Sequence, residues 1–280
     1  MSEASAKKPS DLPTRFAAAV VMIAVACAAI YIGGGVFRLL VAAGAAAMLV
    51  EGGDMHRARR PWSYAGAGLL AVTLLAVTQY LYPAGEIDLI DGVEGVSAES
   101  FDELWIGFAA VAGVAALFGV ATRRLSLGWG LLYVGAPAFA LAVLEWTRFD
   151  LVLWAMLVTW STDTFAYFAG RSIGGPKLAP RISPNKTWAG LIGGMAGAAI
   201  VGAVAAYLFE LDRLFLLAGA PMGLLAQLGD LYESRVKRRL GVKDSGSLLP
   251  GHGGVLDRVD GLLPVALATL LLLILVLNGA

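Results

Sequence analysis

The sequence has a single cysteine, Cys27, and few charged residues. One cysteine excludes an intramolecular disulfide and any metal site built from several thiolates. Charged residues make up 15% of the chain and hydrophobic residues 58%, with a mean hydropathy of +0.74, whereas soluble domains carry about 25% charged residues. The apolar runs are of helical length and show no period-2 alternation, which argues against a transmembrane β-barrel. The sequence therefore predicts an integral membrane protein made of helices.

Nine apolar stretches are candidates for crossing the bilayer, which takes about 20 residues in a helix. The second stretch is short. They lie near residues 16–32, 36–50, 62–82, 105–121, 127–145, 149–170, 187–208, 213–229 and 261–278. We expect an all-α polytopic membrane protein, a helical bundle of about nine transmembrane helices.

Basic residues gather in alternate connections between these stretches. If the N-terminus is cytoplasmic, all Lys and Arg except Arg38, Arg148 and Arg213 fall on the cytoplasmic side, while segment 83–104 is acidic and has no basic residue. Cytoplasmic loops carry an excess of Lys and Arg. We therefore expect a cytoplasmic N-terminus, a C-terminus outside, and a multi-pass protein of the cell membrane, in a bacterium the inner membrane.

The polarity of the stretches divides the chain. Residues 1–14 are predicted to be a disordered cytoplasmic tail, followed by an uncleaved first span rather than a secretory signal. Residues 15–148 contain few charges and are interpreted as a transmembrane scaffold. Residues 149–280 are interpreted as the catalytic region, with cytoplasmic loops 171–186 and 231–260. No internal repeat is visible, which disfavours an inverted-repeat transporter.

Asp163 lies within the sixth predicted span, in a run of Thr and Ser. An ionisable residue inside a span is costly and indicates function by default. The alternative is an ion pair with a Lys or Arg of another helix that only holds the bundle together.

The basic loop after this span contains Ser183, Pro184 and Lys186. Ser followed by Pro fits an N-cap and a first helical position, so the seventh span is predicted to start there, where free N–H groups and Lys186 could bind phosphate. An ordinary positive-inside loop is the alternative. Within the span, small residues recur at Gly190 and Gly194 and at Gly193 and Gly197, which indicates close helix packing inside the bundle or across a dimer.

Carboxylates cluster where the eighth and ninth spans meet water. Asp230 shares a helix face with Glu233 and Lys237 if the eighth helix continues, and Asp257 and Asp260 are three residues apart. Acidic groups gathered at a low-dielectric boundary repel one another unless they are protonated, paired or bound to a cation. With oxygen ligands only, the natural cation is Mg²⁺, which takes one or two carboxylates plus substrate phosphates.

Basic and flexible residues surround these acids. The phosphates of a substrate would find counter-charges in Lys237, Arg238, Arg239, Lys243 and Arg258. Glycines from Gly246 to Gly254 let the backbone approach a ligand closely. His252 could contact phosphate or transfer a proton, or it could be a structural donor to a carbonyl. Together these residues predict a metal-assisted phosphate site.

The same segment carries a motif of fixed spacing. It reads Ser-x-Val-Lys-Arg at 234–238, Lys-Asp-x-Gly at 243–246 and Leu-Pro-x-His-Gly-Gly-Val-x-Asp-Arg-Val-Asp at 249–260. This pattern resembles the signature of phosphatidate cytidylyltransferases, also called CDP-diacylglycerol synthases, with every fixed position present. Similar residues extend back to Asp163 and Ser183, so specific motifs cover the C-terminal half, and the N-terminal half is similar only in hydropathy and length.

The resemblance implies conversion of phosphatidate and CTP to CDP-diacylglycerol and pyrophosphate with Mg²⁺, at a cytoplasmic active site. It implies Asp230 and Asp257 as metal ligands. We expect Asp260 to complete that shell, Asp163 to hold a second cation or orient Lys186, and Lys237 to act in catalysis. Expected substrate-binding residues are Ser183, Lys186, Arg238, Lys243, Asp244, His252, Gly253, Gly254 and Arg258. The expected partners are CTP, phosphatidate and membrane lipids, with a homodimer left open and no nucleic acid.

Three other functions are compatible with parts of the sequence. A CTP-using enzyme with another lipid acceptor, such as a polyprenol kinase or a CDP-archaeol synthase, would share the topology, and lipid profiling separates it. An ion-coupled transporter could use Asp163 and Asp230 as a cation path, but would move ions without turning over CTP. A regulatory homologue would bind CTP without reacting, although all the signature acids are present.

Overall fold

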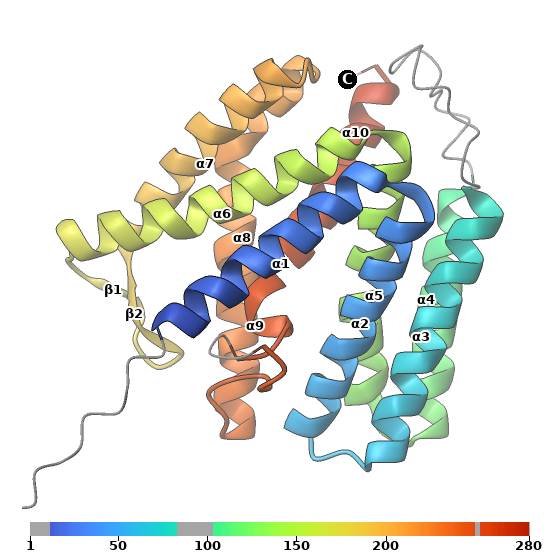
Figure 1. Ribbon diagram of the computed structural model, residues 1–280. Coiled ribbons are helices and arrows are strands. Elements are labelled where there is room, and N and C mark those ends of the chain that lie inside the picture. The colour runs from blue at the N-terminus through green and yellow to red at the C-terminus, as the bar shows by residue number, and fades with distance from the viewer. Residues whose placement is uncertain (1–11, 83–102, 250–252, 280) are drawn as a thin grey trace, which may run out of the picture.

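The computed structural model describes residues 12–82, 103–249 and 253–279. It is an all-α membrane bundle with one small antiparallel hairpin (Figure 1). The helices are α1 (Leu12–Ile32), α2 (Gly34–Met55), α3 (Arg60–Leu81), α4 (Leu104–Ala121), α5 (Leu125–Thr147), α6 (Phe149–Ser172), α7 (Trp188–Leu208), α8 (Arg213–Leu240), α9 (Leu256–Val259) and α10 (Leu262–Leu277). The strands are β1 (Lys177–Ala179) and β2 (Ser183–Thr187).

Six of the described helices are long and apolar enough to cross a membrane, namely α2, α3, α4, α5, α7 and α8. This confirms a polytopic helical membrane protein. Helices α1, α6 and α10 lie at the other three predicted spans. The count of nine spans and the cytoplasmic N-terminus stay predictions, and the predicted tail at 1–14 lies mostly outside the described residues.

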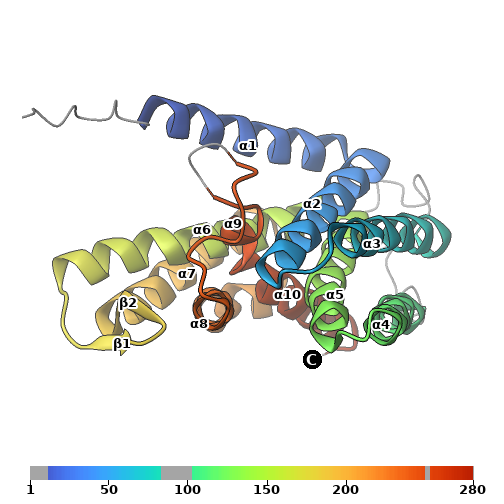
Figure 2. The same ribbon diagram turned by 90° about the horizontal axis from the view of Figure 1, so that it is seen from below.

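Helix α5 lies in the middle of the bundle and contacts α2, α3, α4, α6 and α10. Helices α6, α7 and α8 form a second group that packs beside it, and α1 lies along the outside (Figure 2). The α2–α3 connection and the C-terminal end of α8 lie at one end of the bundle, and the chain's C-terminal end lies at the other (Figure 1). Both basic segments therefore lie at the same end, as the predicted topology requires.

The glycine pattern of α7 packs against α6. A Cβ on Gly193 would lie 2.2 Å from Cβ of Ala169, and one on Gly197 would lie 2.3 Å from the Phe165 ring. Gly194 faces the Thr162 carbonyl in the same way, at 2.9 Å. Small residues let helix backbones approach closely in a membrane. The stripe thus serves packing within one chain, which was one of its two predicted uses.

Helix α8 is longer than a membrane span. It begins at the N-cap Asp212, whose side chain accepts a hydrogen bond from Leu214 N, and ends at Gly241 in the left-handed conformation. Its 28 residues extend about 42 Å at 1.5 Å per residue, against a hydrocarbon core of about 30 Å. The prediction that this helix continues past Asp230 is confirmed, and its last turns carry Glu233, Lys237 and Arg238.

The prediction that α7 starts at Ser183 is wrong. Ser183–Thr187 is the second strand of the hairpin, pairing Ala179 with Ser183 and Lys177 with Thr187. The N-cap is Thr187, whose hydroxyl accepts from Gly190 N at 3.0 Å. Pairing with β1 keeps the backbone at Pro184 extended. Proline is tolerated there because β2 is an edge strand, where a missing N–H donor leaves no ladder hydrogen bond unmade. The predicted all-α fold is correct apart from this hairpin.

Two basic residues outside the predicted cytoplasmic set have internal partners. Arg38 is buried and donates to the Thr78 carbonyl at 3.1 Å and to the Tyr82 carbonyl at the end of α3. Arg148 pairs with Asp150 at the start of α6. Both guanidinium groups thus have hydrogen-bond acceptors within the protein, which gives a structural reason for their position outside the basic loops.

The α6–α7 contact can be tested with Gly193→Ala. The added methyl group overlaps Ala169, and overpacking typically costs about 1–3 kcal/mol. We expect a lower midpoint of thermal unfolding in detergent. Gly113→Ala in α4 is the matched control, because a Cβ there meets nothing within 4 Å. Equal midpoints for the two variants would contradict the packing described here.

Candidate active site

The polar centre of the structure is the carboxylate of Asp257, in the short helix α9. Lys237 Nζ of α8 lies 2.6 Å from Oδ1. Oδ2 accepts from Ser245 N at 2.8 Å, Ser245 Oγ at 3.0 Å and Gly254 N at 2.9 Å. The side chain is only 8% exposed. The fold therefore brings together signature residues that are separated by up to 20 positions.

These donors set the charge of Asp257. Burial alone would raise its pKa, but the hydrogen bonds from Lys237, Gly254 and Ser245 outweigh burial and hold the pKa below its usual value. Asp260 differs, since burial raises its pKa and the negative charge of Asp230 acts in the same direction, against the hydrogen bond from Gly261 N. Asp257 is thus an ionised carboxylate at neutral pH, next to a second acid that is more easily protonated.

Glu233 is the most buried acid of this cluster. Its side chain is 2% exposed, and Lys237 Nζ lies 3.3 Å from its Oε1, one helical turn along α8. Lys237 is therefore shared between Glu233 and Asp257. Both Glu233 oxygens are buried, and neither has a hydrogen bond of good geometry to another described residue. An ammonium group between two acids offsets part of their mutual repulsion.

Asp230 forms a second polar group on the same helix. Lys186 Nζ of β2 lies 2.5 Å from its Oδ2 and 2.9 Å from Gln227 Oε1. Ser234 Oγ donates to Oδ1 at 3.2 Å. The Asp230 side chain is 32% exposed, so it is the more accessible of the two predicted metal ligands. The hairpin thereby delivers a cationic group to the α8 carboxylates.

The other predicted residues lie around these two groups. Arg238 Nε donates to the Ile182 carbonyl at 3.3 Å, which ties α8 to the hairpin carrying Ser183. Gly253 has φ +83°, and a Cβ there would lie 2.9 Å from Asp257 Oδ2. The exposed members of the predicted set are Arg238, Lys243, Asp244, Arg258 and, in α6, Asp163. His252 lies outside the described residues.

The donor chemistry suits a hard cation, although the ligand set is incomplete without substrate. Within residues 12–82, 103–249 and 253–279, no three His, Cys, Asp or Glu side chains form a metal-binding group. Mg²⁺ needs only one or two carboxylates when phosphates supply further oxygens. Asp230 and Asp257 could provide them, each now paired with a lysine that could equally bind phosphate.

Two features were missed by the sequence reasoning. Glu51 of α2 is buried and accepts hydrogen bonds from Ser245, Val255 and Leu256, at the other side of the Asp257 site. Its only signal in the sequence is an acid at the end of an apolar stretch. The second feature is an apolar cavity beside the carboxylates. Its lining residues are apolar and aromatic, as membrane-facing side chains also are, so the sequence does not reveal the cavity.

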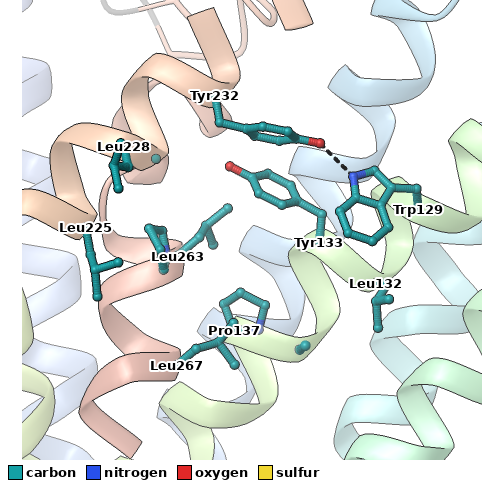
Figure 3. A pocket seen from close by; sticks show the side chains of 12 residues that line it. Trp129, Leu132, Tyr133, Pro137, Leu225, Leu228, Tyr232, Leu263 and Leu267 are labelled. Atoms are coloured by element: carbon teal, nitrogen blue, oxygen red, sulfur yellow. Dashed lines mark hydrogen bonds between the residues drawn. The ribbon is translucent and has the colours of Figure 1, made fainter. Parts of the chain in front are cut away.

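This cavity has a volume of about 330 Å³ and lies between α5, α8 and α10 (Figure 3). Its lining is Leu, Pro, Ala and aromatic side chains, together with Gly229, the neighbour of Asp230 in sequence. At one end Trp129 Nε1 donates to the Tyr232 hydroxyl at 2.6 Å, and the Tyr133 ring lies 5.0 Å from that of Tyr232. An apolar space thus adjoins a charged site.

Known proteins are similar to nearly the whole chain or to part of it. The profile of the cytidylyltransferase family matches residues 13–276. A phosphatidate cytidylyltransferase of Brucella abortus (strain 2308) is 41% identical over 275 residues, 94% of this chain and 93% of the relative. A phosphatidate cytidylyltransferase of Staphylococcus haemolyticus is 51% identical over 112 residues, which are 39% of this chain and 43% of the relative. The chain belongs to the cytidylyltransferase family.

Proposed function

We propose that this protein transfers the cytidylyl group of CTP to phosphatidate, producing CDP-diacylglycerol and pyrophosphate. The observation that carries the proposal is that the signature residues Lys237, Gly254 and Asp257 meet, together with Ser245, in one hydrogen-bonded group. A homologue that had kept the motif but lost the activity would not need these residues to contact one another. The similarity to phosphatidate cytidylyltransferases over nearly the whole chain gives the same reaction.

In the proposed reaction a phosphate oxygen of phosphatidate attacks the α-phosphorus of CTP. The bond between the α-phosphorus and the bridging oxygen to the β-phosphate breaks, and pyrophosphate leaves with that electron pair. A phosphate monoester is already a nucleophile at neutral pH, so no strong general base is required. The protein's task is to position two anions in line and to neutralise their charge.

The residues that would do this are the lysines and arginines around α8. Lys186 and Lys237 each lie beside a carboxylate, from which they could turn to the triphosphate. Arg238, Lys243 and Arg258 would bind the outer phosphates and the leaving pyrophosphate. Asp230 and Asp257 would hold Mg²⁺, with Asp260 completing the shell directly or through water, and the bound cation would supply charge neutralisation at the phosphates. Asp163 is proposed for a second cation.

The reaction would take place on the cytoplasmic side of the inner membrane of a bacterium. This rests on the predicted cytoplasmic N-terminus and on the basic connections at one end of the bundle (Figure 1). CTP would enter from the cytosol, and the phosphatidate head group would reach the site from the bilayer. The cavity between α5, α8 and α10 would take an acyl chain, because it is apolar and adjoins Asp230 through Gly229.

The reaction is tested by pyrophosphate release from purified protein with phosphatidate, CTP and Mg²⁺. Release should need both substrates. In Asp257→Asn the rate should fall by at least about 100-fold, since even the outer partners of metal ligands cost 10- to 100-fold when removed. Asp54→Asn, at an exposed acid of α2, is the matched control. No release by folded wild type across several lipids would reject the proposed function, and an unaffected Asp257→Asn would reject the site.

The acyl-chain site is tested with Leu267→Trp, which fills part of the cavity. We expect a several-fold higher KM for long-chain phosphatidate, an unchanged KM for CTP, and little effect with a short-chain phosphatidate. Leu271→Trp is the control, because that side chain lies one turn along α10 and is 58% exposed. If both variants have the same phosphatidate KM as wild type, the acyl chain lies elsewhere.

A further inference from the structure

Glu51 is a buried acid whose hydrogen-bond partners, among the described residues, all come from the signature segment. Its side chain lies in the last turns of α2 and is 6% exposed. Oε1 accepts from Val255 N at 2.9 Å, and Oε2 accepts from Leu256 N at 3.0 Å and lies 3.1 Å from Ser245 Oγ. These partners are 194 to 205 positions away in sequence. A carboxylate buried in an apolar bundle is stabilised only where such donors meet it.

The partners of Glu51 adjoin those of Asp257. The amide of Gly254 donates to Asp257, and the next two amides, Val255 and Leu256, donate to Glu51. Ser245 Oγ lies within hydrogen-bond distance of both carboxylates, at 3.1 and 3.0 Å. A hydroxyl has one proton to donate, so the two acids share it. Any shift of Glu51 therefore changes the donors that orient Asp257.

Two signature glycines fit closely around the same carboxylate. A Cβ on Gly246 would lie 2.8 Å from Glu51 Cγ, and one on Gly254 would lie 2.5 Å from Glu51 Oε2 and 2.0 Å from Ser245 Oγ. We call Ser245, Gly246, Gly254, Val255 and Leu256 the Glu51 cradle. The cradle leaves no space for side chains at Gly246 and Gly254. Close packing against Glu51 therefore explains why these positions are glycine, in addition to the approach of a ligand.

We propose that Glu51 is a positioning residue for the cytidylyl transfer, holding the cradle so that Asp257 keeps its orientation towards Lys237. This inference rests on the proposed function. It assigns a role in the reaction to the N-terminal part of the chain, which the sequence indicates only as scaffold. Glu51 itself touches no reacting atom, since the cradle lies between it and Asp257.

The test compares Glu51→Gln with Glu145→Gln. Glu145 is also a buried acid, and it accepts from a backbone amide of a neighbouring helix, Gly34 N at 2.8 Å, but it has no contact with the cradle. Both Glu51 oxygens accept hydrogen bonds, so in Glu51→Gln the amide NH₂ faces an N–H or O–H donor and one acceptor is lost. In Glu145→Gln the amide oxygen can keep the bond from Gly34 N. Glu51→Gln should therefore unfold at a lower temperature than wild type, and both variants are assayed well below their midpoints.

Glu51→Gln should lower kcat by roughly 10- to 100-fold, the usual effect of removing an outer partner of a functional carboxylate. The KM for phosphatidate should not change. Hydrogen–deuterium exchange should be faster at the Val255 and Leu256 amides, which is a readout independent of turnover. Glu145→Gln should retain wild-type kcat and wild-type exchange at those amides.

Ser245→Ala keeps the inference testable if Glu51→Gln does not fold. Removing the shared hydroxyl should lower kcat by roughly tenfold with the KM for phosphatidate unchanged. If Glu51→Gln folds and keeps wild-type kcat, the inference is overturned and the proposed function stands. If only Ser245→Ala folds, wild-type kcat in that variant has the same meaning. Absence of turnover in the wild type would instead reject the proposed function.

Discussion

The structure depends on the pairing of Lys237 with Asp257 at the membrane boundary. Several acids lie together there, and Glu233 is almost fully buried beside them. Such a cluster is unfavourable in a low-dielectric region unless cations or N–H donors compensate the charge. Lys237 lies between Glu233 and Asp257, and backbone amides supply the remaining donors. Removing the lysine would leave two acids facing each other.

This pairing explains features that are distant from it. Helix α8 must run beyond the membrane to carry Lys237 to α9, and its 28 residues allow that. The hairpin of β1 and β2 brings Lys186 to Asp230 from the other side of α8. Helix α2 completes the arrangement with Glu51 beneath the cradle. Three distant parts of the chain thus meet at one end of the bundle.

Much of the helical architecture was predictable, because apolar length and charge pattern determine where a membrane helix can form. The helix-packing glycines of α7 and the extension of α8 were also evident from spacing. The hairpin was not, since Ser183 and Pro184 fit a helix start equally well and only pairing with β1 selects the strand. Glu51 was not predictable either: hydropathy locates a helix in the chain but does not say which distant segment it contacts.

The most direct measurement is an experimental structure of the protein with Mn²⁺ and a non-hydrolysable CTP analogue. We expect the cation to bind the carboxylates of Asp230 and Asp257, with the triphosphate within reach of Lys186 and Lys237. A cation or nucleotide bound away from the C-terminal end of α8 would contradict it.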